Sequence, residues 1–195
     1  MLAVLVGLKG SGKTTLMKKV KDLRPDIKHI VAGDYFAEYY KKKGLKRDEG
    51  DKNVESSEHF KIQREIFKKL RKEADKHDHV IVDTHAFLTK TEGFYPGLPW
   101  FALKELEPDV LIALEFRPED ILQRRKKDEK ELGRKRSAAS SIEGVKFEYE
   151  IQRNFLCAAA GMIGCTVKLL RRMEPESYKF EHVDKNAEEL LELFK

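Results

Sequence analysis

Short apolar runs alternate with longer segments of helical periodicity along the whole chain. The runs have the length of buried strands, whereas the segments between them repeat apolar side chains every three or four positions. Strands that alternate with helices form a parallel sheet covered on both faces. We therefore expect an α/β fold with three layers around a five-stranded parallel sheet. The predicted strands are Leu2–Val6, Ile27–Val31, Val80–Val82, Val110–Phe116 and Thr166–Leu170.

Helix start and stop residues mark the segments between these strands. Lys13–Leu23 keeps its apolar side chains on one face and is followed by Pro25. Asp34 is expected to cap a short helix, Tyr35–Lys43, which Gly44 ends. The next predicted elements are a helix from Ser56 or Ser57 to about Lys76 with Phe60 and Ile66 inward, a loop over Thr84–Pro99 and a helix ending before Pro108. They are followed by a charged stretch from Pro118 to about Glu150 with helical ends, by an apolar helix, and by a C-terminal helix with Val183, Ala187, Leu190 and Phe194 on one face.

The first strand leads into a glycine-rich segment that matches G-x-x-x-x-G-K-[ST], the phosphate loop or P-loop. Gly10 and Gly12 let the backbone turn tightly, so that consecutive N–H groups point at phosphate oxygens. The helix that follows adds its positive N-terminal end. Lys13 is expected to reach the β- and γ-phosphates, Thr14 to bind Mg²⁺ and Thr15 to bind the α-phosphate. The predicted nucleotide-binding residues of this segment are Gly7, Lys9, Gly10, Ser11, Gly12, Lys13, Thr14 and Thr15.

A carboxylate follows the third predicted strand. Asp83 ends the run Val80-Ile81-Val82, and in P-loop folds that position lies beside the phosphate loop, where an acid orients Mg²⁺ through water. Thr14 and Asp83 are therefore the predicted metal-binding residues. The sequence carries neither the Asn-Lys-x-Asp run of guanine-specific GTPases nor the Ser-Gly-Gly signature of ATP-driven transporters. These features predict a nucleoside triphosphate site and leave its reaction open.

Two insertions favour phosphate transfer between nucleotides, which requires that water be excluded and that positive charge surround the phosphoryl group. Residues 117–136 contain nine basic and five acidic residues, and a mobile lid of this composition could close over the phosphates. The alternative is a pair of solvated charged helices. The predicted catalytic residues are Lys13, Arg124, Arg134, Arg136 and Arg153.

The second insertion, Asp34 to Lys76, follows the second strand and could hold the phosphate acceptor. Its aromatic residues could flank a base, although such a group more often serves plain helix packing; they are Tyr35, Phe36, Tyr39 and Tyr40. Arg47 could bind the acceptor phosphate. His85 follows Asp83 at the carboxyl end of a strand, where ligands gather in open α/β sheets, and a structural histidine is the alternative. The predicted substrate-binding residues are Asp34, Arg47 and His85.

Composition narrows the class of protein further. A chain of 195 residues with 41% hydrophobic residues can form one domain with a core and inserted subdomains. Charged residues make up 37%, and the excess of Lys and Glu is typical of proteins from hot environments. The net charge of +5 favours anionic ligands without requiring nucleic acid.

Neither a membrane span nor a signal peptide is expected. The longest mostly apolar run, Phe155–Val167, is shorter than the roughly 18 residues of a spanning helix. At the N-terminus the lysines follow the apolar stretch, which is the reverse of the order in a signal peptide. If Cys157 and Cys165 share a helix, they are about 12 Å apart, too far for a disulfide. A reducing cytoplasmic compartment is the simplest interpretation.

Val82-Asp83-Thr84-His85-Ala86, followed by Gly93-Phe94-Tyr95-Pro96-Gly97-Leu98-Pro99, resembles the archaeal-type adenylate kinases. That family shows a Val-Asp-Thr-His segment followed by Gly-Tyr-x-Pro-Gly-Leu-Pro. The resemblance extends over nearly the whole chain and includes the phosphate loop. Its further matches are Gly33-Asp34, Arg47-Asp48-Glu49, Arg124-Arg125, Arg153 and Gly164-Cys165-Thr166-Val167-Lys168.

The resemblance implies a reversible transfer of phosphate from MgATP to AMP that gives two ADP. It implies one kinase domain over residues 1–195, an acceptor subdomain at about 34–76, a lid at about 118–150 and frequently a homotrimer. By position, the adenine of ATP would lie near Arg125 and the turn Arg172–Pro175. The lid arginines would be Arg124, Arg125, Arg134, Arg136 and Arg153.

The chain departs from the family pattern near the expected acceptor. Asp51 stands where the family usually has an arginine near the acceptor phosphate, and Lys9 and Ser11 stand where Pro and Val are common. Two alternatives therefore stay open. One is a kinase of the same fold for another nucleoside monophosphate. The other is a P-loop ATPase that acts as a switch or assembly factor with RNA, with the basic lid and Lys41–Arg47 as contacts to the phosphate backbone.

Overall fold

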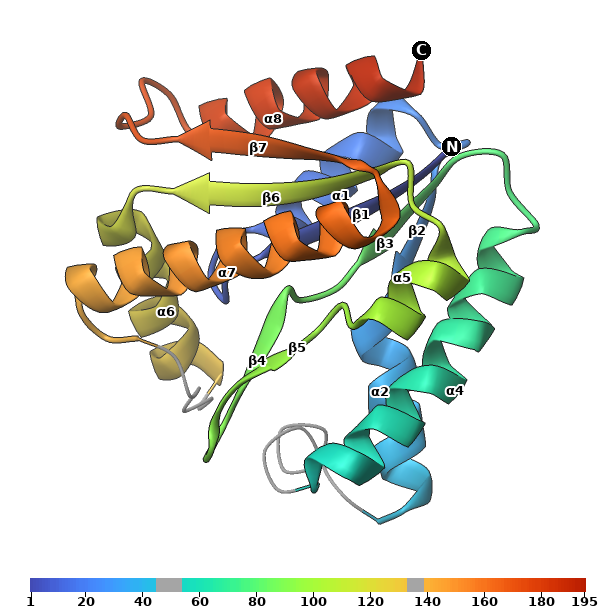
Figure 1. Cartoon of the computed structure of the whole chain (residues 1–195). Coiled ribbons are helices and arrows are strands. Elements are labelled where there is room, and N and C mark those ends of the chain that lie inside the picture. The colour runs from blue at the N-terminus through green and yellow to red at the C-terminus, as the bar shows by residue number, and fades with distance from the viewer. Residues whose placement is uncertain (45–53, 133–138) are drawn as a thin grey trace.

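A computed structural model of the chain describes residues 1–44, 54–132 and 139–195 (Figure 1). Its main feature is a parallel sheet of five strands in the order β2-β3-β1-β6-β7, which confirms the predicted α/β class. Because β1 lies at the centre, its carboxyl end is flanked by those of β3 and β6. The strands are β1 (Leu2–Gly7), β2 (Lys28–Val31), β3 (Val80–Asp83), β6 (Val110–Phe116) and β7 (Thr166–Arg172).

Helices cover both faces of the sheet. Successive side chains of β1 point to opposite faces and are all apolar, so each face needs a cover. Val4 and Val6 belong to the core cluster under α4, α5 and α7, whereas Ala3 and Leu5 belong to the cluster under α1 and α8. The helices are α1 (Lys13–Leu23), α2 (Ala32–Lys42), α4 (Ser56–Ala74), α5 (Trp100–Leu106), α6 (Pro118–Leu132), α7 (Ile142–Ile163) and α8 (Glu181–Leu191), with a 3₁₀ turn over Glu192–Phe194.

A β-hairpin occupies the segment Thr84–Pro99 that was expected to be a loop, so that prediction is wrong. The hairpin pairs β4 (Phe87–Lys90) with β5 (Gly93–Pro96) and extends away from the sheet (Figure 1). Its base lies against the end of β3, where Gly97 donates to the carbonyl oxygen of Ala86 at 2.8 Å. A side chain at Gly97 would collide with the carbonyl group of His85, so glycine is required there.

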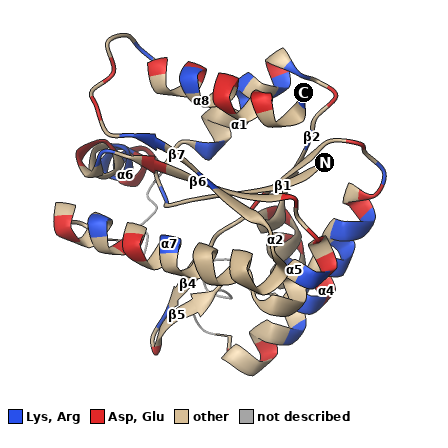
Figure 2. Ribbon diagram, turned by 45° about the horizontal axis from the view of Figure 1, so that its top comes forward, with Lys and Arg blue, Asp and Glu red and all other residues tan. Residues whose placement is uncertain are grey.

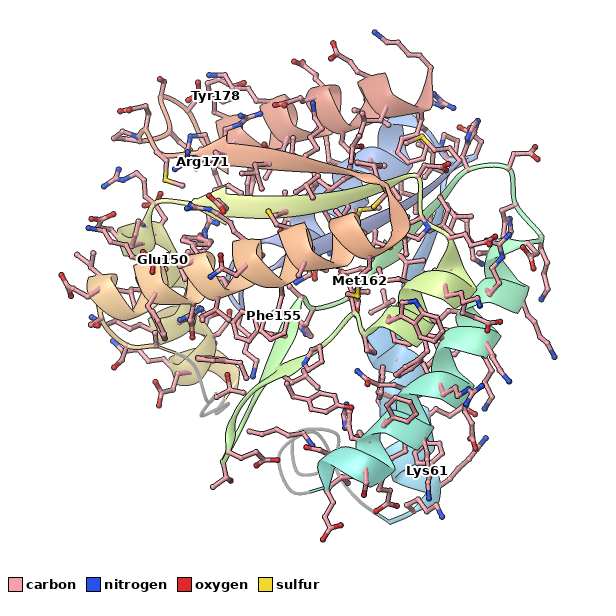
Figure 3. The ribbon with its side chains drawn as sticks, viewed as in Figure 1. Lys61, Glu150, Phe155, Met162, Arg171 and Tyr178 are labelled. Carbon is pink, nitrogen blue, oxygen red and sulfur yellow. The ribbon has the colours of Figure 1, made fainter. Side chains whose placement is uncertain are left out.

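The hairpin is also fastened to the helices around it. The ring of Phe87 stacks on that of Phe155 with the centroids 6.2 Å apart, and Figure 3 shows Phe155 pointing from α7 toward the hairpin. On the other side, the amide nitrogen of Gln63 in α4 donates to the carbonyl oxygen of Pro96 at 3.1 Å. The hairpin therefore forms a wall between α7 and α4.

Two further expectations about the helices are corrected. The helix expected over Tyr35–Lys43 begins at Ala32, directly after β2, so Asp34 lies in its first turn and is not its cap. Phe60, expected to face inward, is 43% exposed, and its ring meets that of Phe101 edge to face with the centroids 4.4 Å apart. Its exposure reflects the position of α4 over the short helix α5, which leaves one side of that residue in solvent.

The long helix α7 includes both the end of the charged stretch, predicted to reach about Glu150, and the apolar helix that was predicted to follow it. Ser141 caps it by accepting a hydrogen bond from the Gly144 N–H at 3.1 Å. The charged residues of α7 lie toward its N-terminal end (Figure 2), and none follows Arg153. Tyr149 fixes this helix to the end of β6, because its hydroxyl binds both the N–H and the carbonyl oxygen of Phe116, at 2.8 and 3.0 Å.

Candidate active site

The phosphate loop has the backbone that anion binding requires. Gly10 and Gly12 adopt positive φ angles of 89° and 75°, a region that disfavours residues with a side chain. The Ser11 N–H donates to the carbonyl oxygen of Leu8 at 3.0 Å, and Thr15 N–H to that of Gly12 at 3.0 Å. The loop therefore passes directly into the N-terminus of α1, where free N–H groups and the helix dipole favour a phosphate.

Lys13, at the start of α1, and Asp83, at the end of β3, meet beside this loop. The Lys13 ammonium group donates to the carbonyl oxygen of Gly7 at 3.0 Å and lies 3.8 Å from a carboxylate oxygen of Asp83. The other oxygen of Asp83 lies 3.7 Å from Nε2 of His29. A cation and a carboxylate, both largely buried, thus occupy the predicted position at the carboxyl ends of β1 and β3.

One large cavity of about 1220 Å³ opens over the phosphate loop and continues on both sides of it. It brings together most of the predicted site residues. Those that line it are Gly7, Lys9, Gly10, Ser11, Gly12, Lys13, Thr14, Thr15, Asp83, His85, Arg124 and Arg125.

Arg124 and Arg125 bring α6 against the phosphate loop. Arg125 donates to the carbonyl oxygen of Lys9 at 2.8 Å and to a carboxylate oxygen of Glu148 at 2.8 Å. The guanidinium of Arg124 lies over the ring of Phe116, 4.8 Å from its centroid. Both arginines line the cavity, so α6 places two cations beside the expected phosphates.

Arg153 lies apart from this group. It forms a double hydrogen bond to Glu115, at 2.6 and 2.7 Å, and Arg171 lies 3.0 Å from the same carboxylate. Glu115 is fully buried, and its hydrogen bond to Arg153 raises the pKa of that guanidinium. Arg153 is not among the residues that line the cavity, so the structure does not bring it together with Lys13.

The remaining predictions for the acceptor side divide into three outcomes. Phe36 and His85 line the cavity. Asp34 is exposed and does not line it, whereas the Tyr40 ring is buried, with its hydroxyl 3.2 Å from Nδ1 of His59. Arg47, Arg134 and Arg136, with Asp51, lie outside the described residues, so their roles stay predictions.

On the other side of the phosphate loop the cavity reaches the segment after β7. The adenine of ATP was expected near Arg125 and the turn Arg172–Pro175. The residues that line this end of the cavity come directly after that turn in the sequence. They are Glu176, Lys179, Phe180, Val183 and Asn186. Glu181 anchors this segment by accepting a hydrogen bond from the Ser177 N–H at 2.5 Å, and hydrogen bonds from Lys185 and Ser177 lower the Glu181 pKa to about 2.

Sequence reasoning missed three buried amides in the cavity wall. Gln63, Gln152 and Asn186 are each 1% exposed, and each has a polar side-chain atom without a hydrogen-bond partner among the described residues. A polar residue on the apolar face of a helix is the signal that could have revealed them. Asn186, for example, lies beside Ala187 in the apolar face predicted for the last helix.

No group of three or more His, Cys, Asp or Glu side chains within residues 1–44, 54–132 and 139–195 could hold a metal ion by itself. A divalent cation at Thr14 and Asp83 would therefore need further oxygen ligands from phosphates and water, which is how Mg²⁺ is usually held.

None of the helices in the described part of the chain is long and apolar enough to cross a membrane.

Comparison with known proteins finds a matching family and several relatives that are all adenylate kinases. A family described as "AAA domain" matches residues 6–143. The adenylate kinase of Pyrobaculum aerophilum is 39% identical, over 99% of this chain and 96% of its own length. That of Methanopyrus kandleri is 35% identical over 86% of each chain. The adenylate kinase of Methanocaldococcus jannaschii is 32% identical over the whole of this chain and 98% of its own.

Solved structures share the architecture at low sequence identity. Shikimate kinase from Acinetobacter baumannii superposes with a TM-score of 0.57 at 14% identity, covering 99% of this chain and 92% of that one. Shikimate kinase from Aquifex aeolicus gives 0.53 at 15% identity, covering 100% and 96%. These similarities establish the fold, a P-loop kinase architecture, and carry nothing about the substrate.

Proposed function

The chain belongs to the adenylate kinase family, and from this premise we propose that it transfers the γ-phosphoryl group of MgATP to AMP, reversibly, to give two molecules of ADP. The observation that carries this proposal is the continuity of the cavity. One space contains the phosphate loop, reaches the segment after β7 on one side and reaches α2, α4 and the hairpin on the other. Two nucleotides can therefore lie with their phosphates facing each other.

The donor is proposed to lie with its phosphates on the loop and its adenine between Arg125 and the segment Glu176–Phe180. Lys13 contacts the β- and γ-phosphates, and Thr15 contacts the α-phosphate. The Lys13 ammonium group is held beside the loop by the carbonyl oxygen of Gly7. Its charge is therefore positioned before the reaction begins, which is how fixed charges lower a barrier most effectively.

Thr14 and Asp83 are proposed to hold Mg²⁺ together with phosphate oxygens and water. Both line the cavity, and one is a hydroxyl and the other a carboxylate, the hard oxygen donors that Mg²⁺ prefers. When bound, the ion neutralises charge on the phosphates. Asp83 also lies 3.8 Å from Lys13, so the carboxylate orients this cation as well.

In the proposed reaction an oxygen of the AMP phosphate attacks the γ-phosphorus of ATP. A new P–O bond forms to AMP, the bond from the γ-phosphorus to the β–γ bridging oxygen breaks, and ADP leaves with that oxygen. The protein supplies positive charge and alignment. Lys13, Arg124 and Arg125 are proposed to supply the charge on the donor side, with Arg134, Arg136 and Arg153 joining as a lid over about residues 118–150 closes.

The acceptor is proposed to bind in the subdomain at about residues 34–76, between α2, α4 and the hairpin. Phe36 and His85 line this part of the cavity, and Arg47 is proposed to bind the acceptor phosphate. Exclusion of water by the closing lid keeps ATP from being hydrolysed. We further propose a cytoplasmic enzyme from a hot environment that assembles as a homotrimer, a state that light scattering tests.

The experiment that tests this function is an acceptor panel. Purified protein with MgATP is supplied in turn with AMP, GMP, CMP, UMP and dAMP, and each diphosphate is quantified. Conversion of AMP with kcat/KM at least tenfold above that of the ribonucleotides GMP, CMP and UMP is expected. A preference for another monophosphate makes the protein a kinase of the same fold with a different acceptor. ATP hydrolysis that RNA stimulates, without any acceptor being phosphorylated, identifies the ATPase alternative.

A further inference from the structure

The outer face of α4 carries a net positive charge nearly as large as that of the whole chain. Seven positions between residues 60 and 72 are exposed; five of them are basic and one, Glu65, is acidic. Five cations and one carboxylate leave a charge of +4 on this face, against +5 for all 195 residues. Figure 2 shows positive residues along α4. The five cations are Lys61, Arg64, Lys68, Lys69 and Lys72.

Four of these cations, which we call the cationic ridge, have no ionic partner among the residues that the structure describes. They are Lys61, Arg64, Lys68 and Lys72. Arg71 on the flank of the same helix, by contrast, pairs with Asp75 at 2.7 Å. Lys68 and Lys72 follow Lys61 after about two and three whole turns, so the three side chains leave the same side of the helix. A row of unpaired cations attracts a polyanion that runs along it.

Two exposed aromatic rings lie beside the N-terminal part of the ridge. Phe60 precedes Lys61, and its half-exposed ring meets that of Phe101 in α5. Trp100, the residue before Phe101, is 54% exposed. The ammonium group of Lys104 lies 5.2 Å from the centroid of the Trp100 ring, which adds a further cation to this surface. Basic side chains next to exposed aromatic rings are the combination that binds single-stranded nucleic acids.

We propose that the cationic ridge and the rings of Phe60 and Trp100 bind single-stranded RNA, with its phosphates along α4 and unpaired bases on the two rings. Each nucleotide supplies one negative phosphate and one base with a flat π face, so the strand is complementary to both features of the surface. In double-stranded RNA the bases are stacked on one another, and only the charges would find partners. None of these six described residues lines the nucleotide cavity, so the inference adds a second binding surface to the proposed kinase.

Trp100 makes this surface directly observable, because it is the only tryptophan of the chain. The wild type is titrated with oligouridine of about 15 nucleotides, near the upper end of single-strand site sizes, while the Trp100 fluorescence is recorded. Saturating ADP and Mg²⁺ keep the strand out of the nucleotide cavity. The expected result is saturable quenching, with an association constant that falls linearly with salt concentration on a double-logarithmic plot. An RNA duplex of equal length is expected to leave most of the fluorescence unquenched.

Reversal of charge tests the ridge. Lys61→Glu, Lys68→Glu and Lys72→Glu, introduced together, are expected to weaken binding at least tenfold and to reduce the salt slope by about 2, or roughly 0.7 for each lost phosphate contact. The matched control reverses three exposed lysines of α1 and α7, away from the ridge. It consists of Lys18→Glu, Lys21→Glu and Lys146→Glu. The control changes the net charge equally and is expected to bind RNA within about threefold of the wild type, and both variants should keep their kcat for AMP.

Absence of quenching by the single strand, or equal quenching by the duplex, overturns the inference. An equal loss of affinity in the two charge-reversal variants also overturns it, because net charge alone would then attract the strand. An oligomer that Trp100→Ala dissociates, and that does not bind RNA, assigns the surface to a second copy of the chain instead. If the ridge variant does not fold, Phe60→Ala replaces it. Its affinity is expected to fall at least fivefold with the salt slope unchanged, and an unchanged affinity overturns the inference. The proposed function fails separately, through the absence of ADP formation.

Discussion

Arg125 Nε donates a hydrogen bond to the carbonyl oxygen of Lys9 at 2.8 Å, and this contact binds α6 to the phosphate loop. The same guanidinium also donates to the carbonyl oxygen of Ala139, just before α7, and to the carboxylate of Glu148 within α7. The loop, α6 and α7 are therefore joined through one side chain. Any change in the loop that displaces α6 is expected to reach the nucleotide site, and Gly10 is the residue at which this coupling can be tested.

Gly10→Ala is expected to reduce both stability and activity. Its φ of +89° costs about 1–2 kcal/mol for a residue with a side chain, and the added Cβ would lie 3.3 Å from the carbonyl oxygen of Ile121 in α6. The expected result is a lower Tm and a kcat/KM for ATP at least tenfold below the wild type. Gly44→Ala is the control, because Gly44 has a φ of +74° and no atom of the described residues lies within 4 Å of an added Cβ. It should lose a similar amount of stability and keep its ATP kinetics.

Arg153→Ala distinguishes a catalytic role from a structural one. Arg153 and Arg171 both bind the buried carboxylate of Glu115, so each variant removes one ionic partner of the same group. If Arg153 moves to the phosphates when the lid closes, Arg153→Ala should lower kcat at least tenfold with little change in ATP affinity. Arg171→Ala should leave kcat within about threefold. Equal effects of the two substitutions on kcat would mean that Arg153 only supports the fold.

His59 is expected to make stability depend on pH. Its pKa is lowered from 6.5 to about 4 by burial, so below pH 6.5 the unfolded chain binds a proton that the folded chain does not. The free energy of unfolding contributed by this group therefore falls as the pH drops from about 6.5 to about 4 and is constant below. Urea unfolding of wild type and His59→Gln across pH 4 to 8 measures it. The curve of the variant should be shallower within this window, and parallel curves would contradict the assignment.

Lys13→Ala is expected to abolish transfer without unfolding the protein. Removal of a fixed group that stabilises developing negative charge typically lowers kcat about 10²- to 10³-fold. The Lys13 ammonium group lies 3.0 Å from Gly7 O beside the phosphate loop, where that charge develops. Lys21→Ala is a matched control, because Lys21 is an exposed lysine of the same helix. Its kcat should equal that of the wild type. A Lys13→Ala enzyme within tenfold of the wild type would show that the site is wrongly assigned.

Local patterns predicted the parts of the fold that depend on neighbours in sequence. The bounds of α1 and β6 agree with the prediction, because a glycine-rich turn, a helical face and a run of apolar residues identify them locally. The hairpin was missed because Gly93, Pro96 and Gly97 are typical of loops. Its strands form through packing on Phe155 and through the hydrogen bond from Gln63, and both partners are distant in sequence.

In the candidate site, too, local patterns predicted some residues, whereas others depend on partners distant in sequence. The phosphate loop and Asp83 follow from a motif and from the end of a strand, and the structure brings Lys13 and Asp83 within 3.8 Å. Gln63 follows from no motif, and its only signal in the sequence is that it falls on the same helical face as the buried residues Ile66 and Phe67. Its role as a buried wall residue with a hydrogen bond to Pro96 of the hairpin becomes visible only in the structure.

Phosphorus NMR of the wild type with equal amounts of MgATP and AMP tests the central claim most directly. The account predicts that the signals of ATP and AMP decrease together, that only ADP signals grow until equilibrium is reached, and that no inorganic phosphate accumulates, because the γ-phosphoryl group passes to AMP and not to water. Growth of inorganic phosphate together with ADP, while the AMP signal stays constant, would contradict it and would show that the cavity binds ATP for hydrolysis.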